Sequence, residues 1–236
     1  MYCVEHDNEI IIIDAGVKFA EEGLPGIDYV IPDYSYLKRN ENKIRGLLIT
    51  HGHEDHIGGI PFLLQVVKIP FIYASPLACA MITRKLEEKR LTNATHLIRI
   101  DDEYQIKTKY FNIEFFRTTH SIPDSHGVVI HTPDGTIVMT GDFKFDMTPI
   151  GPMANLHKMA RIGEKGVSVL MSDSTNAMSP GTSLSESVVD ENLKEIFSTY
   201  TSNRIILATF ASNVYRIKHI IETVSYTHLR AHETGA

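Results

Sequence analysis

The sequence predicts an α/β protein in which strands alternate with helices, and three observations favour this class. Short apolar runs typical of buried strands recur along the chain, as at 10–13, 47–49 and 167–171. Helix signals separate some of them, for example the Ser75-Pro76 pair that opens an amphipathic segment. Several apolar runs end close to an Asp or a His, and in layered α/β folds functional side chains gather beyond the carboxyl ends of strands.

The composition is that of an ordinary globular protein. Its 236 residues, 43% of them hydrophobic, suffice for one large domain or one domain plus part of another. Two cysteines, Cys3 and Cys79, form no disulfide framework, which favours a reducing cytoplasm. No membrane span or secretory signal is indicated. The net charge of −6 argues mildly against non-specific nucleic-acid binding by the whole surface and leaves the partner open.

In the first hundred residues we predict strands over 9–13, 45–50 and 71–73 and helices over 57–67 and 76–90. The strand over 9–13 is apolar after Glu9 and ends at Asp14. Because it begins so close to Met1, we expect further strands of the domain upstream of this chain. Pro61 falls in the first turns of its helix, where proline is tolerated. Ser75 is predicted to cap the helix that follows it.

A β-hairpin is the clearest signal in the second half of the chain. Two apolar strands, over 128–132 and 136–140, flank the turn sequence Pro133-Asp134-Gly135. Further strands are expected over 110–119 and 167–171. Because His120 precedes the first hairpin strand and Asp142 follows the second, antiparallel pairing is expected to bring both to the same open end.

The character of the sequence changes after Pro180. Ser183 and Glu186 form a capping box before a helical run of apolar residues. A strand over 204–209 and a helix over 213–223 are predicted next. We interpret this unit as the beginning of a second domain. Residues 224–236 resemble translated adapter sequence from a sequencing library and are interpreted as a non-native artefact.

The densest cluster of metal-binding side chains is His51-Gly52-His53-Glu54-Asp55-His56. Imidazole and carboxylate groups are the donors that Zn²⁺ and similar divalent ions prefer. His51 and His53 can chelate one ion, and Asp55 and His56 can reach a second ion nearby. The alternative is a polar loop with solvated histidines, and the density of ligands argues against it. The loop is therefore predicted to bind metal.

Asp14, this His-x-His-x-Asp-His loop, His120 and Asp142 together resemble the metallo-β-lactamase superfamily. Within it the chain is most similar to the β-CASP nucleases, and among these to the bacterial ribonuclease J family. The segments that carry the resemblance are 31–37, 48–61, 119–125, 140–146, 172–177 and 208–213. The histidine loop alone indicates only the superfamily, and the later segments narrow the match.

The resemblance implies a fold and a site. The fold is an αββα sandwich, with a metallo-β-lactamase domain over 1–180 and the beginning of an inserted β-CASP domain over 181–223. The implied ligands are His51, His53 and His120 for one zinc, Asp55 and His56 for the second, and Asp142 bridging both. Mn²⁺ is the alternative metal. Asp14 would fix the metal loop from behind, and Asp55, Asp142 and Asp173 would be the catalytic carboxylates.

The resemblance also implies an activity, namely two-metal hydrolysis of single-stranded RNA by 5′-to-3′ exonuclease and endonuclease action. The family acts in RNA maturation and decay in the cytoplasm, and the full-length protein is expected to be a homo-oligomer or part of an RNA-decay complex. The histidine partner of Asp173, a late metal-binding histidine and the C-terminal domain have no counterpart in this sequence. The chain is therefore interpreted as a fragment truncated at both ends and is expected to be inactive.

Two other functions stay open. A small-molecule hydrolase of the same fold would act on thioesters or lactams, and the segment after Pro180 argues against it because an inserted cover domain suits a polymer channel. A non-catalytic RNA-binding subunit is the other, and the presence of all six early ligand positions argues against it. Parallel assays with single-stranded RNA and with a thioester substrate would discriminate the two enzymes.

The remaining candidates have competing interpretations. We predict that His126 is a solvated loop histidine and that His131 is a paired, surface or half-buried residue. Phe210, Ser212 and Asn213 match a family segment near the RNA 5′ end, where an aromatic ring could stack on a base. A core Phe beside a helix N-cap fits these three residues equally well. Lys144 could reach a phosphate or be a solvated surface lysine. We interpret four other histidines as structural: His6, His96, His157 and His219.

Overall fold

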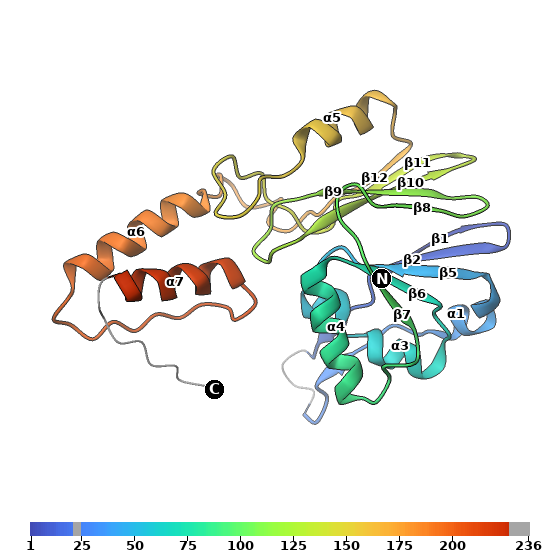
Figure 1. Ribbon diagram of the computed structural model, residues 1–236, viewed down its shortest axis with the longest axis horizontal. Coiled ribbons are helices and arrows are strands. Elements are labelled where there is room, and N and C mark those ends of the chain that lie inside the picture. Colours follow the sequence, from blue (N-terminus) through green and yellow to red (C-terminus); the bar gives the residue numbers. More distant parts are fainter. Residues whose placement is uncertain (21–24, 227–236) are drawn as a thin grey trace. The chain divides into compact units, whose positions relative to one another are not determined.

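The computed structural model of the protein describes residues 1–20 and 25–226 and divides into two compact units (Figure 1). The first unit comprises residues 1–118, 124–143 and 155–173. The second comprises 119–123, 144–154 and, of the described residues, 174–226. Most of the segment interpreted as an artefact, 227–236, lies outside the described residues.

One sheet of the first unit has the strand order β1-β2-β5-β6-β7. Its strands are β1 (Tyr2–His6), β2 (Glu9–Ile13), β5 (Ile44–Leu48), β6 (Phe71–Ala74) and β7 (His96–Arg99). β1 is antiparallel to β2, and all other neighbours are parallel. The carboxyl ends of β2, β5 and β6 therefore meet at one edge of the sheet.

The other sheet has the order β12-β11-β10-β9-β8. Its strands are β8 (Gln105–Lys107), β9 (Asn112–Arg117), β10 (His126–Thr132), β11 (Gly135–Met139) and β12 (Val169–Met171). β10 and β11 form the predicted hairpin, with Val128 opposite Met139 and Thr132 opposite Gly135. β12 runs parallel to β11, so both strands end at the same edge of this sheet.

Helices lie on the outer faces of the two sheets (Figure 1). The helices of the first unit are α1 (Ser35–Arg39), the 3₁₀ helix η1 (Glu41–Lys43), α2 (Glu54–Ile57), α3 (Ile60–Val66), α4 (Pro76–Glu88) and α5 (Leu156–Glu164). A short antiparallel pair, β3 (Lys18–Phe19) and β4 (Tyr29–Val30), completes the unit. None of the helices among the described residues is long and apolar enough to cross a membrane.

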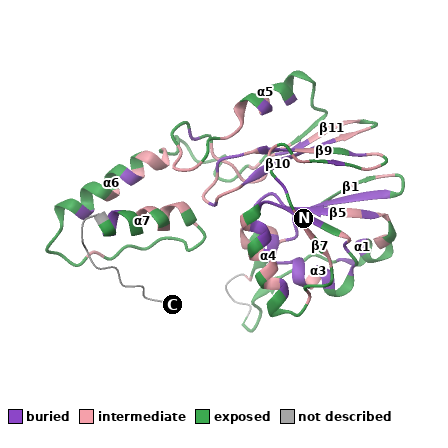
Figure 2. Cartoon of the chain, in the orientation of Figure 1, coloured by how far each residue is buried: buried purple, intermediate pink, exposed green. Residues whose placement is uncertain are grey.

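Three apolar interfaces hold these layers together. Alternate residues of β2 point to opposite faces, so Ile10 and Ile12 pack against the helices while Ile11 and Ile13 pack between the two sheets. A smaller cluster that includes Val129 and Ile162 joins the second sheet to α5. The order helix, sheet, sheet, helix is the predicted αββα sandwich, and the prediction is confirmed. Figure 2 shows that burial is concentrated in these two sheets.

The second unit contains α6 (Glu186–Thr199) and α7 (Val214–Tyr226). They are joined by an ion pair of 2.7 Å between Arg216 Nη2 and Glu186 Oε2, and by a contact of 2.7 Å between His219 Nδ1 and Asp190 Oδ1. The predicted strand over 204–209 is wrong, because this segment has no regular secondary structure. A strand needs a hydrogen-bonded neighbour, and none of the described strands pairs with it.

Two helix starts also differ from prediction. The predicted helix over 57–67 begins later, as α3 at Ile60, and Ile57 instead ends the preceding helix α2. The Gly59 amide donates to the Ala15 carbonyl at 2.8 Å, which separates the two helices. Helix α6 begins at Glu186 with Ser185, not Ser183, as its N-cap. The Glu186 amide donates to Asp146 Oδ2 at 2.9 Å, which fixes this start. Ser75 precedes α4 as predicted, although its side chain makes no capping hydrogen bond.

Candidate metal centre

Asp14 organises the metal loop from behind. It follows β2 directly, is 4% exposed and has a positive φ of 55°. Its Oδ1 accepts the amide of Thr50 at 2.9 Å, and its Oδ2 lies 2.8 Å from His56 Nδ1. One carboxylate thereby fixes the beginning and the end of the histidine loop. Thr50 is the site residue that sequence reasoning missed, and its place directly before His51 was the available signal.

The close packing of the loop requires glycine at position 16. A Cβ atom there would overlap the carbonyl carbon and oxygen of Asp55 in α2. The neighbouring Ala15 amide donates to the His56 carbonyl at 2.8 Å. The segment from Asp14 to Gly16 therefore holds α2 by direct main-chain contact, and α2 carries two of the predicted ligands.

The histidine rings of the loop gather at the carboxyl end of β5. His51 is 1% exposed, and its Nε2 lies 3.1 Å from His53 Nδ1. The ring centroid of His51 is 4.0 Å from that of His56. Two facing ring nitrogens share at most one proton, so such a cluster suits a cation that accepts lone pairs from all three rings.

Asp142 adds a carboxylate to this cluster from the end of β11. Its Oδ1 lies 3.4 Å from His56 Nε2, and its Oδ2 lies 4.0 Å from His51 Nε2. One ligand atom from each of these three residues lies within 4.8 Å of the others. Ligand atoms about 2.0–2.1 Å from a tetrahedral zinc ion stand about 3.4 Å apart, so the spacing fits a divalent cation. Asp55 is more exposed, with Oδ2 at 3.7 Å from His56 Nε2.

Two carboxylates dominate the electrostatics of the cluster. Burial lowers the pKa of His56, but the carboxylates of Asp14 and Asp142 outweigh it and raise the pKa to about 10. A proton then occupies the position at which a divalent cation would neutralise the same carboxylates. Binding of a cation would displace this proton.

Asp173 and His120 are the two remaining residues of the predicted metal centre. Asp173 follows β12, and its amide donates to Thr140 Oγ1 at 3.0 Å, two residues before Asp142. This places its main chain at the same sheet edge as the cluster. His120 belongs to the second unit, in the segment 119–123. Its role as a ligand of the first zinc stays a prediction.

The structure corrects the interpretation of His126. It is not a solvated loop residue but the first residue of β10, 5% exposed and 3.1 Å from Asp102 Oδ1. Sequence reasoning missed this because the partner lies in a different loop, far away along the chain. The prediction for His131 is confirmed, since it is half-buried with Nε2 at 2.9 Å from Glu114 Oε1.

Four residues with competing interpretations lie in the second unit. Phe210 is 84% exposed, so the interpretation of a core Phe is wrong. Asn213 caps α7, with Oδ1 accepting the Arg216 amide at 3.0 Å, and Ser212 is exposed beside it. Lys144 is not a freely solvated lysine, because its Nζ donates to the Leu184 carbonyl and lies 3.5 Å from Glu186 Oε1.

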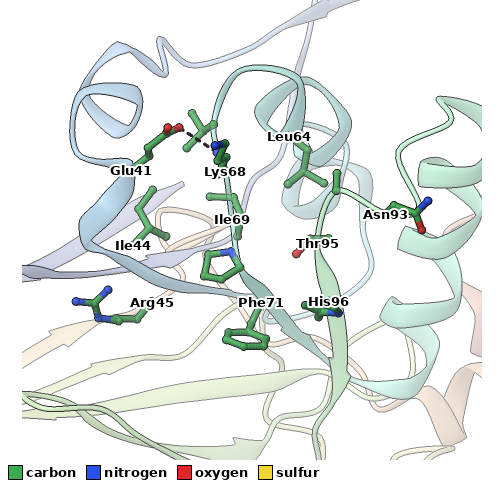
Figure 3. Close-up of a pocket in the computed structure, with 13 residues that line it drawn as sticks. Glu41, Ile44, Arg45, Leu64, Lys68, Ile69, Phe71, Asn93, Thr95 and His96 are labelled. Atoms are coloured by element: carbon green, nitrogen blue, oxygen red, sulfur yellow. Dashed lines mark hydrogen bonds between the residues drawn. The ribbon is translucent and has the colours of Figure 1, made fainter.

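A groove in the first unit lies at the opposite sheet edge, where the parallel strands begin (Figure 3). Ile44, Phe71 and His96 line it, and they are the first residues of β5, β6 and β7. The metal cluster follows the carboxyl ends of neighbouring strands in the same sheet. None of the predicted site residues lines this groove, so it is separate from the candidate metal centre.

Comparison with known proteins assigns the family. The family model of the metallo-beta-lactamase superfamily matches residues 1–167. The chain belongs to the metallo-beta-lactamase superfamily. A crystal structure of a protein of unknown function from Enterococcus faecalis V583 shares this fold at 18% identity, with a TM-score of 0.65 over 93% of this chain and 59% of that chain.

The predicted resemblance to ribonuclease J is confirmed. The chain is 52% identical to ribonuclease J 1 of Streptococcus pyogenes over 96% of its residues. It is 46% identical to ribonuclease J of Mycoplasma genitalium over 94% and to that of Synechocystis over 97%. It spans 40%, 39% and 36% of the length of these three relatives.

Proposed function

We propose that this chain carries the metal centre of a ribonuclease that hydrolyses phosphodiester bonds in single-stranded RNA. One observation carries the proposal. This chain is 52% identical to ribonuclease J 1 over 96% of the chain's own residues, and it also brings ligand atoms of His51, His56 and Asp142 within 4.8 Å of one another. Sequence similarity alone indicates only the family. The clustered imidazole and carboxylate groups add the metal-binding chemistry that hydrolysis in this family needs.

The metal is proposed to be Zn²⁺, with Mn²⁺ as the alternative, and two ions are expected. The proposed ligands are His51, His53 and His120 for one ion, Asp55 and His56 for the other, and Asp142 for both. When bound, divalent ions activate water at neutral pH and neutralise charge on the phosphate oxygens. Imidazole nitrogens and carboxylate oxygens at these spacings fit zinc and manganese.

The protein's own contribution is orientation. The Asp14 carboxylate contacts Nδ1 of the His56 ring, so Nε2 of that ring points toward Asp142. It also holds Thr50, whose Oγ1 lies 3.1 Å from His51 Nδ1 and leaves Nε2 of that ring toward the cluster. Both rings would therefore present Nε2 to a bound cation. Asp55, Asp142 and Asp173 are the proposed catalytic carboxylates.

We further propose that residues 1–180 form the catalytic domain and 181–223 begin a β-CASP domain, with 224–236 non-native. The exposed ring of Phe210 is proposed to stack on an RNA base, beside Ser212 and Asn213. Action in the cytoplasm, 5′-to-3′ exonuclease and endonuclease activity, and a homo-oligomer or RNA-decay complex are also proposals for the full-length protein.

The test uses the full-length protein with single-stranded RNA and, in parallel, a thioester substrate. Asp142→Ala should abolish RNA cleavage while circular dichroism and the unfolding midpoint stay close to those of the parent. Glu103→Ala, an exposed carboxylate between β7 and β8, is the matched control and should cleave normally. Undiminished RNA turnover by Asp142→Ala, or turnover of the thioester but not of RNA by the parent, would refute the proposal.

A further inference from the structure

His126 is held in one orientation by oxygen atoms on both sides of its ring. Its Nδ1 lies 2.9 Å from the carbonyl oxygen of Asp124, and its Nε2 lies 3.1 Å from Asp102 Oδ1. A carbonyl and a carboxylate are both acceptors, so the imidazole lies between two groups toward which a ring N–H can point. Both edges of the ring therefore face oxygen atoms in a site where His126 is 5% exposed.

Asp102 is itself fixed in place. Its Oδ2 accepts from Asn155 Nδ2 at 3.3 Å and lies 3.5 Å from Arg117 Nη1, while Lys158 Nζ donates to its carbonyl oxygen. Burial tends to raise the pKa of this carboxyl, but His126, Arg117 and Asn155 together hold the pKa below its ordinary value. Asp102 is thus ionised at neutral pH beside the ring of His126.

The main chain of His126 contacts the residues next to two proposed ligands. Its amide donates to the carbonyl of Thr50 at 2.9 Å, directly before His51. A Cβ atom at Gly141, directly before Asp142, would lie 2.9 Å from Thr50 Cβ and 3.2 Å from the His126 carbonyl oxygen. Position 126 therefore lies where the metal loop and the β11 turn meet.

We propose that the His126–Asp102 pair is a positioning device that sets the distance between His51 and Asp142 through Thr50 and Gly141. The pair fixes the main chain of His126, and that main chain supports both ligand segments from behind. Asp14 holds the Thr50 amide from one side, and His126 holds its carbonyl from the other. This inference rests on the proposed metal centre and adds two residues that lie outside the ligand set.

The chain contains a matched control pair on the same strand. His131, near the other end of β10, is paired with Glu114 at 2.9 Å and with Thr136 Oγ1 at 3.0 Å. Both pairs join an imidazole of β10 to a carboxylate. The residues paired across the sheet with His131 are Asn112 and Thr136, and neither adjoins a proposed ligand. A substitution of His131 removes a histidine–carboxylate contact on the same strand but keeps the hydrogen bond between the His126 amide and the Thr50 carbonyl.

The experiment measures zinc affinity of the chain by competition with a chromophoric chelator, for His126→Gln, Asp102→Asn, the double variant and His131→Gln. His126→Gln and Asp102→Asn should each weaken zinc binding about tenfold, as changes behind metal ligands do. The double variant should bind zinc no more weakly than either single variant, because each single substitution already breaks the His126–Asp102 contact. His131→Gln should bind zinc within about twofold of the parent, since it leaves the ligand support intact.

A second readout separates this inference from the proposed function. Hydrogen–deuterium exchange of residues 49–57 in the metal-free chain should quicken in His126→Gln and Asp102→Asn but not in His131→Gln. If the parent binds no zinc, the proposed metal centre fails, and the exchange result still decides the positioning role. Parent-like exchange and affinity in both variants would overturn the inference. So would an equal loss in His131→Gln, which would indicate general destabilisation.

Discussion

His56 Nδ1 lies 2.8 Å from Asp14 Oδ2, so the end of β2 is joined directly to the last histidine of the metal loop. The same carboxylate also accepts the Thr50 amide. Two ends of a six-residue loop are thereby fixed by one buried side chain. This arrangement turns a flexible histidine-rich sequence into a preorganised set of ligands.

Asp14→Asn tests this role. Asn tolerates the positive φ of the position, so the change removes charge and one acceptor while keeping the backbone. Zinc affinity, measured by chelator competition, should fall about 10- to 100-fold. Asp7→Asn is the control, since Asp7 also has a positive φ but lies in the β1–β2 turn. Equal zinc affinity in Asp14→Asn and the parent would show that the loop does not depend on this carboxylate.

Gly16→Ala tests the close packing of the loop against α2. A side chain has no space beside the Asp55 carbonyl, so the substitution should cost about 3 kcal/mol of unfolding free energy. Gly163→Ala in α5 is the matched control, because no atom lies within 4 Å of its added Cβ. That change should stabilise the protein by about 0.5–1 kcal/mol through helix propensity. Similar urea midpoints for the two variants would contradict the packing described here.

Glu9 predicts a pH dependence of stability. Its carboxylate accepts from Arg45 Nε at 2.8 Å, Thr108 Oγ1 at 2.6 Å and the Tyr110 amide at 3.1 Å. Burial tends to raise the pKa of Glu9, but these three donors outweigh it and lower the pKa below its ordinary value. The folded state therefore favours the ionised form, and the stability it provides is present above the unfolded pKa of about 4.3.

That stability is lost as the pH falls through the lowered folded-state pKa. Glu9→Gln should accordingly unfold at lower urea than the parent at pH 7, and the difference should shrink as the pH falls below about 4. Glu103→Gln, on an exposed loop, should show little difference at either pH. A gap between Glu9→Gln and the parent that stays constant from pH 7 to pH 3 would argue against an ionised Glu9 in the fold.

Much of the first unit could be predicted from the sequence because its signals are local. The Ile-rich strand before Asp14 and the Pro133-Asp134-Gly135 turn each specify their element within a few residues, and both are present. The burial and pairing of His126 could not be predicted this way, since they depend on Asp102 in a distant loop. Helix α5 was also missed, because it is short and ends close to Gly163 and Gly166, which are poor helix formers.

The start of α6 shows the same limit. A Ser-x-x-Glu pattern favours Ser183 as the cap, but the tertiary contacts of Glu186 with Asp146 and Arg216 move the start of the helix. Ser185 Oγ is the atom that accepts the Ser187 amide, at 3.3 Å. Ser185→Ala should therefore cost about 1 kcal/mol of stability, and Ser183→Ala almost none. Thermal unfolding of the two variants checks this, and the reverse order would favour the sequence-based cap.

The most direct test of the metal centre is elemental analysis of the purified protein after incubation with zinc and removal of excess metal. The proposed metal centre predicts stoichiometric zinc that is lost in the Asp142→Ala variant, together with release of protons on binding as His56 gives up its proton. A parent protein without stoichiometric metal, or one whose metal content is the same in Asp142→Ala, would contradict it.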